Sequence, residues 1–148
     1  MTARARCERG TALVEFTWLA VLLMVPLLYI VLAVFAVQRS AFGVSAAARA
    51  AGRAFVLAPS EAAARPRAVA AARVALADQD LELSRVGIAF ACEPDPANCL
   101  APGETVEVAV SYPVPLPLVP AALGGNTPSI RVQAVHRVPY GRYREDRS

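Results

Sequence analysis

An uncharged run from Thr17 to Val37 is the feature that most constrains how this chain can fold. Counted from Phe16, the apolar segment has 22 residues. As an α-helix rising about 1.5 Å per residue, it would cover roughly the 30 Å hydrocarbon core of a bilayer. Glu15 stands directly before the segment, and a carboxylate at the head of a membrane helix is costly unless it has a partner. The sequence therefore predicts a transmembrane helix whose first turn carries an acid that needs an explanation.

The rest of the chain divides around this segment. Residues 1–10 form a short basic leader that contains Arg4, Arg6 and Arg9, and we expect it to be cytoplasmic. Residues 11–58 are predicted to be the transmembrane helix and its alanine-rich extension. Residues 59–148 are predicted to form an extracytoplasmic α+β domain with a mobile tail from Tyr140, because the chain beyond the span is long enough for one small domain and not for two.

The extension from Gln38 to Leu57 keeps a helical character and carries many small side chains (Gly43, Ser45, Ala46, Ala47, Ala50, Ala51). Small residues allow a second helix to approach closely, inside the membrane or at its edge. The alternative is that alanine is simply a good helix former. Within the span, Pro26 is expected to kink or loosen the helix locally.

A second helix is predicted from Glu61 to Gln79, with Ser60 as its cap and Pro66 interrupting it early. Alternating apolar residues then predict three strands, around residues 86–92, 106–112 and 130–137. One helix packed on a three-stranded antiparallel sheet is sufficient to bury these faces, so we predict an α+β fold for this part of the chain.

The stretch from Tyr112 to Pro120 is apolar and rich in proline. Proline is incompatible with a central strand, so we expect an extended, polyproline-like path here. Two interpretations remain open for its apolar character. It contacts a membrane surface or a partner protein, or it folds back over the sheet.

Cys92 and Cys99 flank a turn-rich loop, while Cys7 lies in the leader. The pair is expected to form a disulfide if the loop faces an oxidising compartment, with free thiols as the alternative. Its spacing is not that of a zinc site. Arginine counts on the two sides of the span scarcely discriminate orientation, so the cysteine pair favours a cytoplasmic N-terminus.

Several function classes are disfavoured. The net charge is only +3 and the arginines are scattered, which argues against nucleic-acid binding. The single histidine, His136, is expected to be an ordinary strand residue, and Asp78, Asp80 and Glu82 a solvated turn or a weak cation site. Common catalytic and nucleotide-binding motifs are absent from the sequence. We therefore expect no enzyme activity, cofactor, metal or small-molecule substrate.

The junction Gly10-Thr11-Ala12-Leu13-Val14-Glu15-Phe16 resembles the prepilin processing signal of type IV pilin-like proteins. Within that group the chain is most similar to the TadE-like pseudopilins of tight-adherence (Flp) pilus systems. The similarity lies in Arg9-Gly10, Val14-Glu15-Phe16, the Ala/Arg helix after the span and the closing Val135-His136-Arg137-Val138. The resemblance implies cleavage after Gly10 by a prepilin peptidase, with Thr11 as the new N-terminus. It also implies other pilin-like subunits and the pilus assembly platform as partners.

The same residues allow a physical role for Glu15. Cleavage would free an α-amine at Thr11, and in a helix bundle this cation would pair with Glu15 of an adjacent subunit. The alternative is that Glu15 only reaches the headgroup level and marks the start of the span.

Two other functions stay open. The N-terminal segment also has features of an export signal, with Val34-Phe35-Ala36 resembling a cleavage site. In that case the protein is a secreted or membrane-anchored small binding module that uses residues 114–119 to contact its ligand. A third class is an accessory subunit of another membrane complex.

Overall fold

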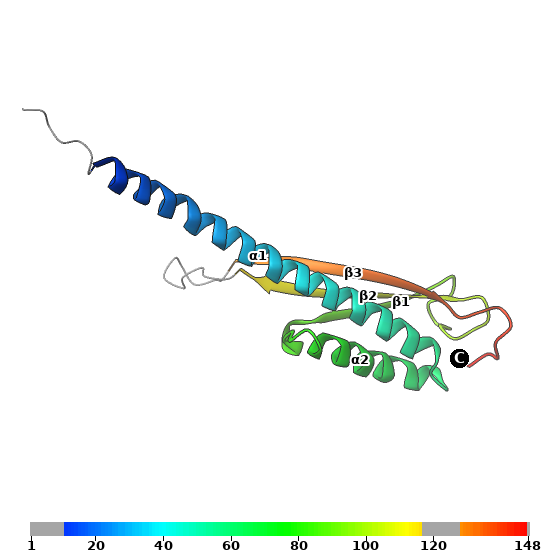
Figure 1. The fold of residues 1–148 in the computed structure, drawn as a ribbon. Helices are drawn as coiled ribbons and strands as arrows, with labels where there is room; N and C mark the ends of the chain where they lie inside the picture. Colours follow the sequence, from blue (N-terminus) through cyan, green and yellow to red (C-terminus); the bar gives the residue numbers. More distant parts are fainter. Residues whose placement is uncertain (1–10, 117–127, 148) are drawn as a thin grey trace, which may run out of the picture.

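The structure is a computed structural model, and it describes residues 11–116 and 128–147. Its elements, in chain order, are α1 (Thr11–Val56), α2 (Glu61–Ala77), a 3₁₀ turn η1 (Leu83–Arg85), β1 (Gly87–Glu93), β2 (Thr105–Pro115) and β3 (Ser129–Pro139) (Figure 1). The predicted α+β fold with a long N-terminal apolar helix, a second helix and a three-stranded antiparallel sheet is confirmed.

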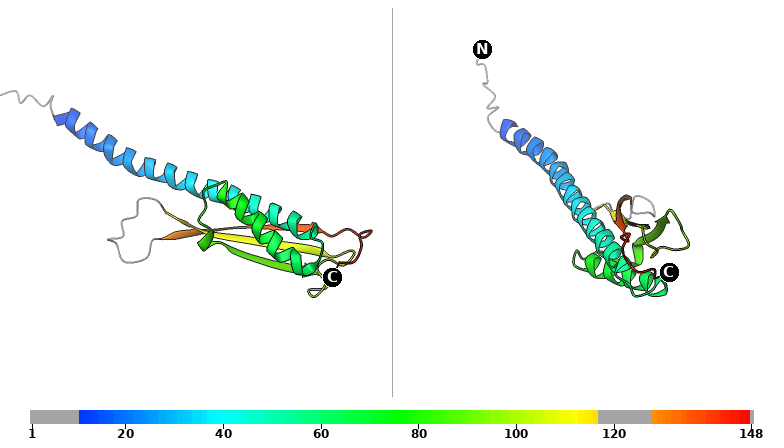
Figure 2. Two further views of the ribbon diagram at one scale, coloured as in Figure 1. Left: turned by 90° about the horizontal axis from the view of Figure 1, so that it is seen from below. Right: turned by 90° about the vertical axis from the view of Figure 1, so that its right-hand side faces the viewer.

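Helix α1 is a single element of 46 residues that extends far beyond the rest of the molecule (Figure 1). Pro26 lies inside it and does not end the helix. The first half of α1 projects away from the sheet in all views, whereas its second half lies along the sheet (Figure 2). One helix therefore serves both the apolar segment and the folded domain.

The second half of α1 covers the sheet directly. Val44, Phe55 and other α1 side chains are fully buried together with the core-facing residues of β2. Helix α2 lies beside α1 and contributes Ala64, Ala68, Ala72 and Leu76 to the same core. We predicted only one helix on the sheet and a domain that begins at residue 59. The packing instead begins within α1, because the extension supplies core side chains.

The small residues of the extension have their partners within the chain. Ala47, Ala48 and Ala51 are buried against the domain. At Gly43 an added Cβ would lie 2.7 Å from Leu81 Cδ1, and at Gly52 it would lie 2.7 Å from Val138 Cγ2. The close approach that these residues permit is thus made by the α2–η1 connection and β3.

Strand β2 is central in the sheet and reaches Pro115, beyond the predicted end at Tyr112. This differs from the expectation that proline excludes the segment from a central strand. The reason is that β1 begins at Gly87, opposite Ser111, so β2 has only β3 as a neighbour after that point.

Hydrogen-bond direction explains why proline is tolerated there. The backbone N–H of Leu116 donates to the carbonyl of Pro128, on the side of β3. Because N–H groups alternate in direction along a strand, the nitrogens of Pro113 and Pro115 point away from β3, where β1 is missing. Of the predicted proline-rich stretch 112–120, residues 117–120 lie outside the described residues, and so its two interpretations stay predictions.

The C-terminal segment differs from the mobile tail that we predicted. Tyr140 is fully buried, and its hydroxyl donates to the carbonyl of Glu145 at 2.7 Å. Arg144 Nη1 donates to the Val56 carbonyl at 2.9 Å, and Arg147 Nη1 donates to the Ala58 carbonyl at 3.1 Å. These cations satisfy carbonyls at the C-terminal end of α1, where positive charge is favoured. Residues 140–147 are therefore ordered, and they bind the C-terminal end of α1 through these hydrogen bonds.

Substituting Gly52 tests the close contact between α1 and β3. We expect Gly52→Leu to lower the free energy of unfolding by about 1–3 kcal/mol, because its side chain has no room beside Val138. The measurement is thermal unfolding of the full-length protein in detergent, followed by circular dichroism. Ala41→Leu, at an exposed position of the same helix, is the control and should change stability little. Equal stability of both variants would contradict the close packing.

Candidate functional site

The projecting half of α1 is the first candidate functional feature. Among the described residues, α1 is the one helix that is long and apolar enough to cross a membrane, judged by length and composition. None of its most apolar stretch is buried in the domain. Large apolar side chains such as Phe16, Leu23 and Met24 are each more than two-thirds exposed. A soluble protein rarely leaves so extensive an apolar surface uncovered, so this segment is a candidate for contact with a membrane or with another protein.

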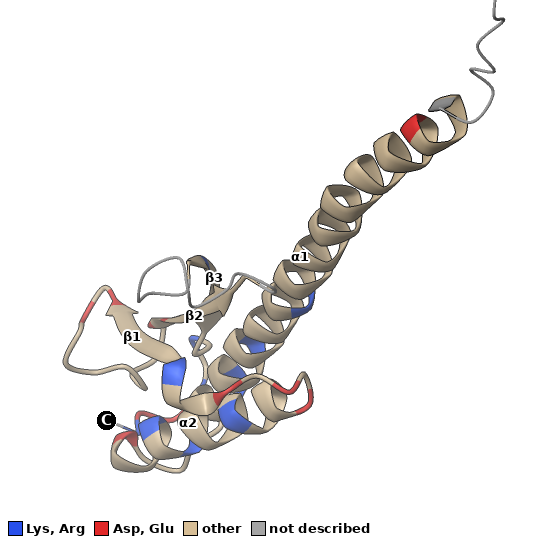
Figure 3. Cartoon of the chain, turned by 90° about the vertical axis from the view of Figure 1, so that its left-hand side faces the viewer, with Lys and Arg blue, Asp and Glu red and all other residues tan. Residues whose placement is uncertain are grey.

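Glu15 lies near the outer end of this segment. It shares a shallow surface with Ala12, Phe16, Trp18 and other apolar residues of α1. A long uncharged stretch of helix separates it from the next charge, and in Figure 3 the acidic turn stands alone at the far end of α1. The carboxylate is therefore placed where a second helix with a cation could reach it.

The predicted cleavage site lies at the border of the described residues. Thr11 is the first residue of α1, and Gly10 lies outside the described residues. Cleavage after Gly10 therefore remains a prediction. Phe16, the residue after Glu15, is 71% exposed and so is free to pack against another helix.

Cys92 and Cys99 form a disulfide at the end of β1, with their Cα atoms 5.3 Å apart. Both cysteines are buried. The enclosed loop is held further by Asp95, whose carboxylate accepts hydrogen bonds from the Ala97 N–H and from Asn98 Nδ2. The buried Glu104 accepts a hydrogen bond from the Asp95 N–H at 3.1 Å. The disulfide predicted from the cysteine spacing is confirmed, and it closes an ordered loop.

The other chemistry-bearing residues are dispersed. His136 lies on β3, as the alternation predicted, and it pairs with Val108 of β2. Asp80 pairs with Arg39, and Glu82 pairs with Arg85 at 2.8 Å, so these carboxylates do not converge. Within residues 11–116 and 128–147, no group of three or more His, Cys, Asp or Glu side chains is arranged to hold a metal ion.

Another ion pair lies on the face of the sheet that points away from α1, and it joins two neighbouring strands. Arg137 Nε lies 2.6 Å from Glu107 Oε2 across β2 and β3. The hydrogen bond to Glu107 raises the pKa of Arg137, and the charge of the same carboxylate acts in that direction too. Because arginine is already cationic at ordinary pH, this pair joins two strands and provides no proton for chemistry.

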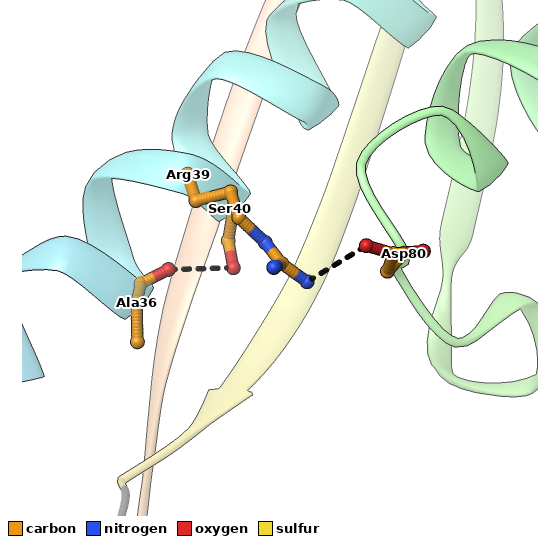
Figure 4. Close-up of polar contacts among 4 residues, drawn as sticks. All are labelled: Ala36, Arg39, Ser40 and Asp80. Atoms are coloured by element: carbon orange, nitrogen blue, oxygen red, sulfur yellow. Dashed lines mark hydrogen bonds and ion pairs between the residues drawn. The ribbon is translucent and has the colours of Figure 1, made fainter.

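Sequence reasoning missed a polar junction where α1 leaves the domain. Arg39 Nη2 lies 3.8 Å from Asp80 Oδ2 in the turn after α2, and Ser40 Oγ donates to the Ala36 carbonyl at 2.9 Å (Figure 4). A cavity of about 430 Å³ opens beside these residues. Arg39 was identifiable as the first charge after the span, but its partner is distant in the sequence and required the fold.

Comparisons of the chain with protein-family models, curated proteins and solved structures found no match.

Removing the disulfide should destabilise the domain. For a loop with a sequence separation of 7, the chain-entropy relation gives about 2–3 kcal/mol. We expect the free energy of unfolding of the Cys92→Ala/Cys99→Ala double variant to be lower by about this amount. The measurement is thermal unfolding of the full-length protein in detergent.

Thiol labelling is the direct check on the bond. In denaturant without reductant, full-length protein should take up one alkyl group, at Cys7, and protein cut after Gly10 should take up none. Labelling of Cys92 or Cys99 before reduction would contradict the bond.

Proposed function

We propose that the chain is a membrane-anchored minor pseudopilin that acts in assembly of tight-adherence (Flp) pili and is processed after Gly10 by a prepilin peptidase. The observation that carries this proposal is the unbroken helix α1, whose first half is apolar and uncovered and whose second half is built into the domain. Such a helix is suited to storage in a membrane and to later packing against equivalent helices. The protein acts in assembly and not as an enzyme.

The spacing of charges along α1 supports a position of its first half across a membrane. Glu15 and Arg39 are 24 positions apart, which corresponds to roughly 36 Å of helix. This slightly exceeds the roughly 30 Å hydrocarbon core, so both charges would reach the polar boundaries of a bilayer. With the N-terminus cytoplasmic, the disulfide-bearing domain would lie outside the membrane, where disulfides persist.

Glu15 would act when subunits meet. Cleavage after Gly10 creates an α-amine at Thr11, four residues before Glu15 on the same helix. In a bundle of apolar helices the amine of one subunit would pair with Glu15 of another, which offsets the cost of burying either charge. The two charges would meet at only one axial shift of the two helices. The pair would therefore select the register in which the helices pack.

Determination of the mature N-terminus tests processing. In the native host we expect a chain that begins at Thr11, because glycine before the cut lets the backbone enter the peptidase in an extended form without side-chain conflict. Gly10→Leu should leave the precursor uncut, while Arg9→Ala, in the same leader, serves as the control. A chain that begins at Val37 would instead identify an export signal and a secreted binding module.

Substitution of Glu15 tests the assembly role. Glu15→Ala should be cleaved normally but should assemble poorly, since removing one partner of a buried ion pair costs about 3–5 kcal/mol. Glu15→Gln keeps the shape without the charge and is expected to show the same defect. The measurement is the amount of pili sheared from cells, compared at equal levels of mature protein. Wild-type pilus yields in both variants would remove Glu15 from the mechanism.

A further inference from the structure

A cavity lies where α1 emerges from the domain. Its volume of about 430 Å³ falls in the range of small-molecule sites. Phe35 and Ala36 of α1 and Val114 and Pro115 of β2 line its apolar part. Its polar part consists of Arg39, Ser40, Asp80 and Tyr112. An apolar wall beside charged residues suits an amphipathic ligand that has an apolar part and a polar headgroup.

The position of the cavity identifies the kind of ligand. The turn after α2 and the end of β2 lie at the end of the domain from which α1 projects (Figure 1). Phe35 and Ala36 belong to the uncharged segment, and Arg39 is the first charge that follows it. If α1 crosses a membrane, as proposed above, the cavity opens at the level of the lipid headgroups, and Arg39 lies where lipid phosphates gather.

The charged rim selects among headgroups. Arg39 Nη2 and Asp80 Oδ2 are 3.8 Å apart, which is longer than a direct hydrogen bond, and their side chains are 53% and 85% exposed (Figure 4). Both groups therefore have donor or acceptor sites available to a ligand. A guanidinium binds phosphate well, and a carboxylate accepts hydrogen bonds from a primary ammonium.

We propose that this cavity binds one phosphatidylethanolamine molecule, with its phosphate on Arg39, its ammonium on Asp80 and the start of an acyl chain against Phe35 and Val114. An anionic lipid fits less well, because Asp78 and Asp80 lie in this turn, Glu82 follows it closely, and Arg85 already pairs with Glu82. The site depends on the membrane placement of α1 and is independent of processing after Gly10.

Native mass spectrometry of the full-length protein in detergent tests the site, with phosphatidylethanolamine, phosphatidylcholine or phosphatidylglycerol added at equal concentration. We expect one phosphatidylethanolamine to be retained most strongly. Phosphatidylcholine is the matched lipid control, because its methylated ammonium cannot donate a hydrogen bond to Asp80. Arg39→Gln and Asp80→Asn should each weaken retention at least about tenfold, the effect of one lost charged hydrogen bond. Arg49→Gln and Asp78→Asn are the matched protein controls and should retain the lipid.

The outcomes separate this site from the anchoring on which it rests. Equal retention of phosphatidylethanolamine and phosphatidylcholine, preference for phosphatidylglycerol, or full retention by Asp80→Asn would overturn the headgroup site. Alkaline carbonate extraction of cell membranes tests anchoring separately. Release of the wild-type chain by carbonate would overturn both proposals, whereas a chain that stays in the membrane without selecting phosphatidylethanolamine would overturn the lipid site alone.

Discussion

The continuity of α1 is the constraint on which the rest of the structure depends. The helix passes, without an intervening loop, from a segment whose most apolar stretch is not buried at all into one with fully buried side chains such as Val44 and Phe55. Phe55 of α1 shows how the helix is built into the domain. It is buried, and the centroid of its ring lies 5.5 Å from the ring centroid of Phe90 on β1. Arg65 of α2 lies over the same Phe90 ring at 5.6 Å. Rotating α1 relative to the sheet would break the contact between Phe55 and Phe90, so the orientation of the projecting half of α1 is coupled to the domain.

Small residues make this arrangement compact. Ala64, Ala68 and Ala72 recur every four positions along α2, which places them on one face of that helix. They are buried in the same core as the small residues of α1, and little side-chain entropy is lost in ordering them. Because alanine has little volume to bury, the larger hydrophobic contribution comes from the valines of β2 and from residues such as Tyr140.

The sequence predicted the elements better than their assembly. Period-two alternation located all three strands, and the uncharged run located the exposed half of α1. The alanine-rich extension was ambiguous, because a small-residue face looks the same whether its partner belongs to another subunit or to α2. Pro113 and Pro115 were misread because their tolerance depends on where β1 begins, which is a property of the sheet. The Arg39–Asp80 pair was invisible for the same reason, since it joins residues brought together only by the fold.

The spacing of charges along α1 also bears on when Glu15 becomes important. If α1 spans a membrane on its own, Glu15 and Arg39 would stand at opposite boundaries of the hydrocarbon, and each would remain hydrated at little cost. If the helices assemble into a bundle, as proposed, apolar side chains such as Phe16 and Leu19 of neighbouring helices would replace the water around Glu15. The carboxylate would then need a cation, and the proposed α-amine at Thr11 of an adjacent subunit would supply one. In the proposed assembly, the need for a partner would thus arise only when the helices pack together, and the charge would then favour one register of packing.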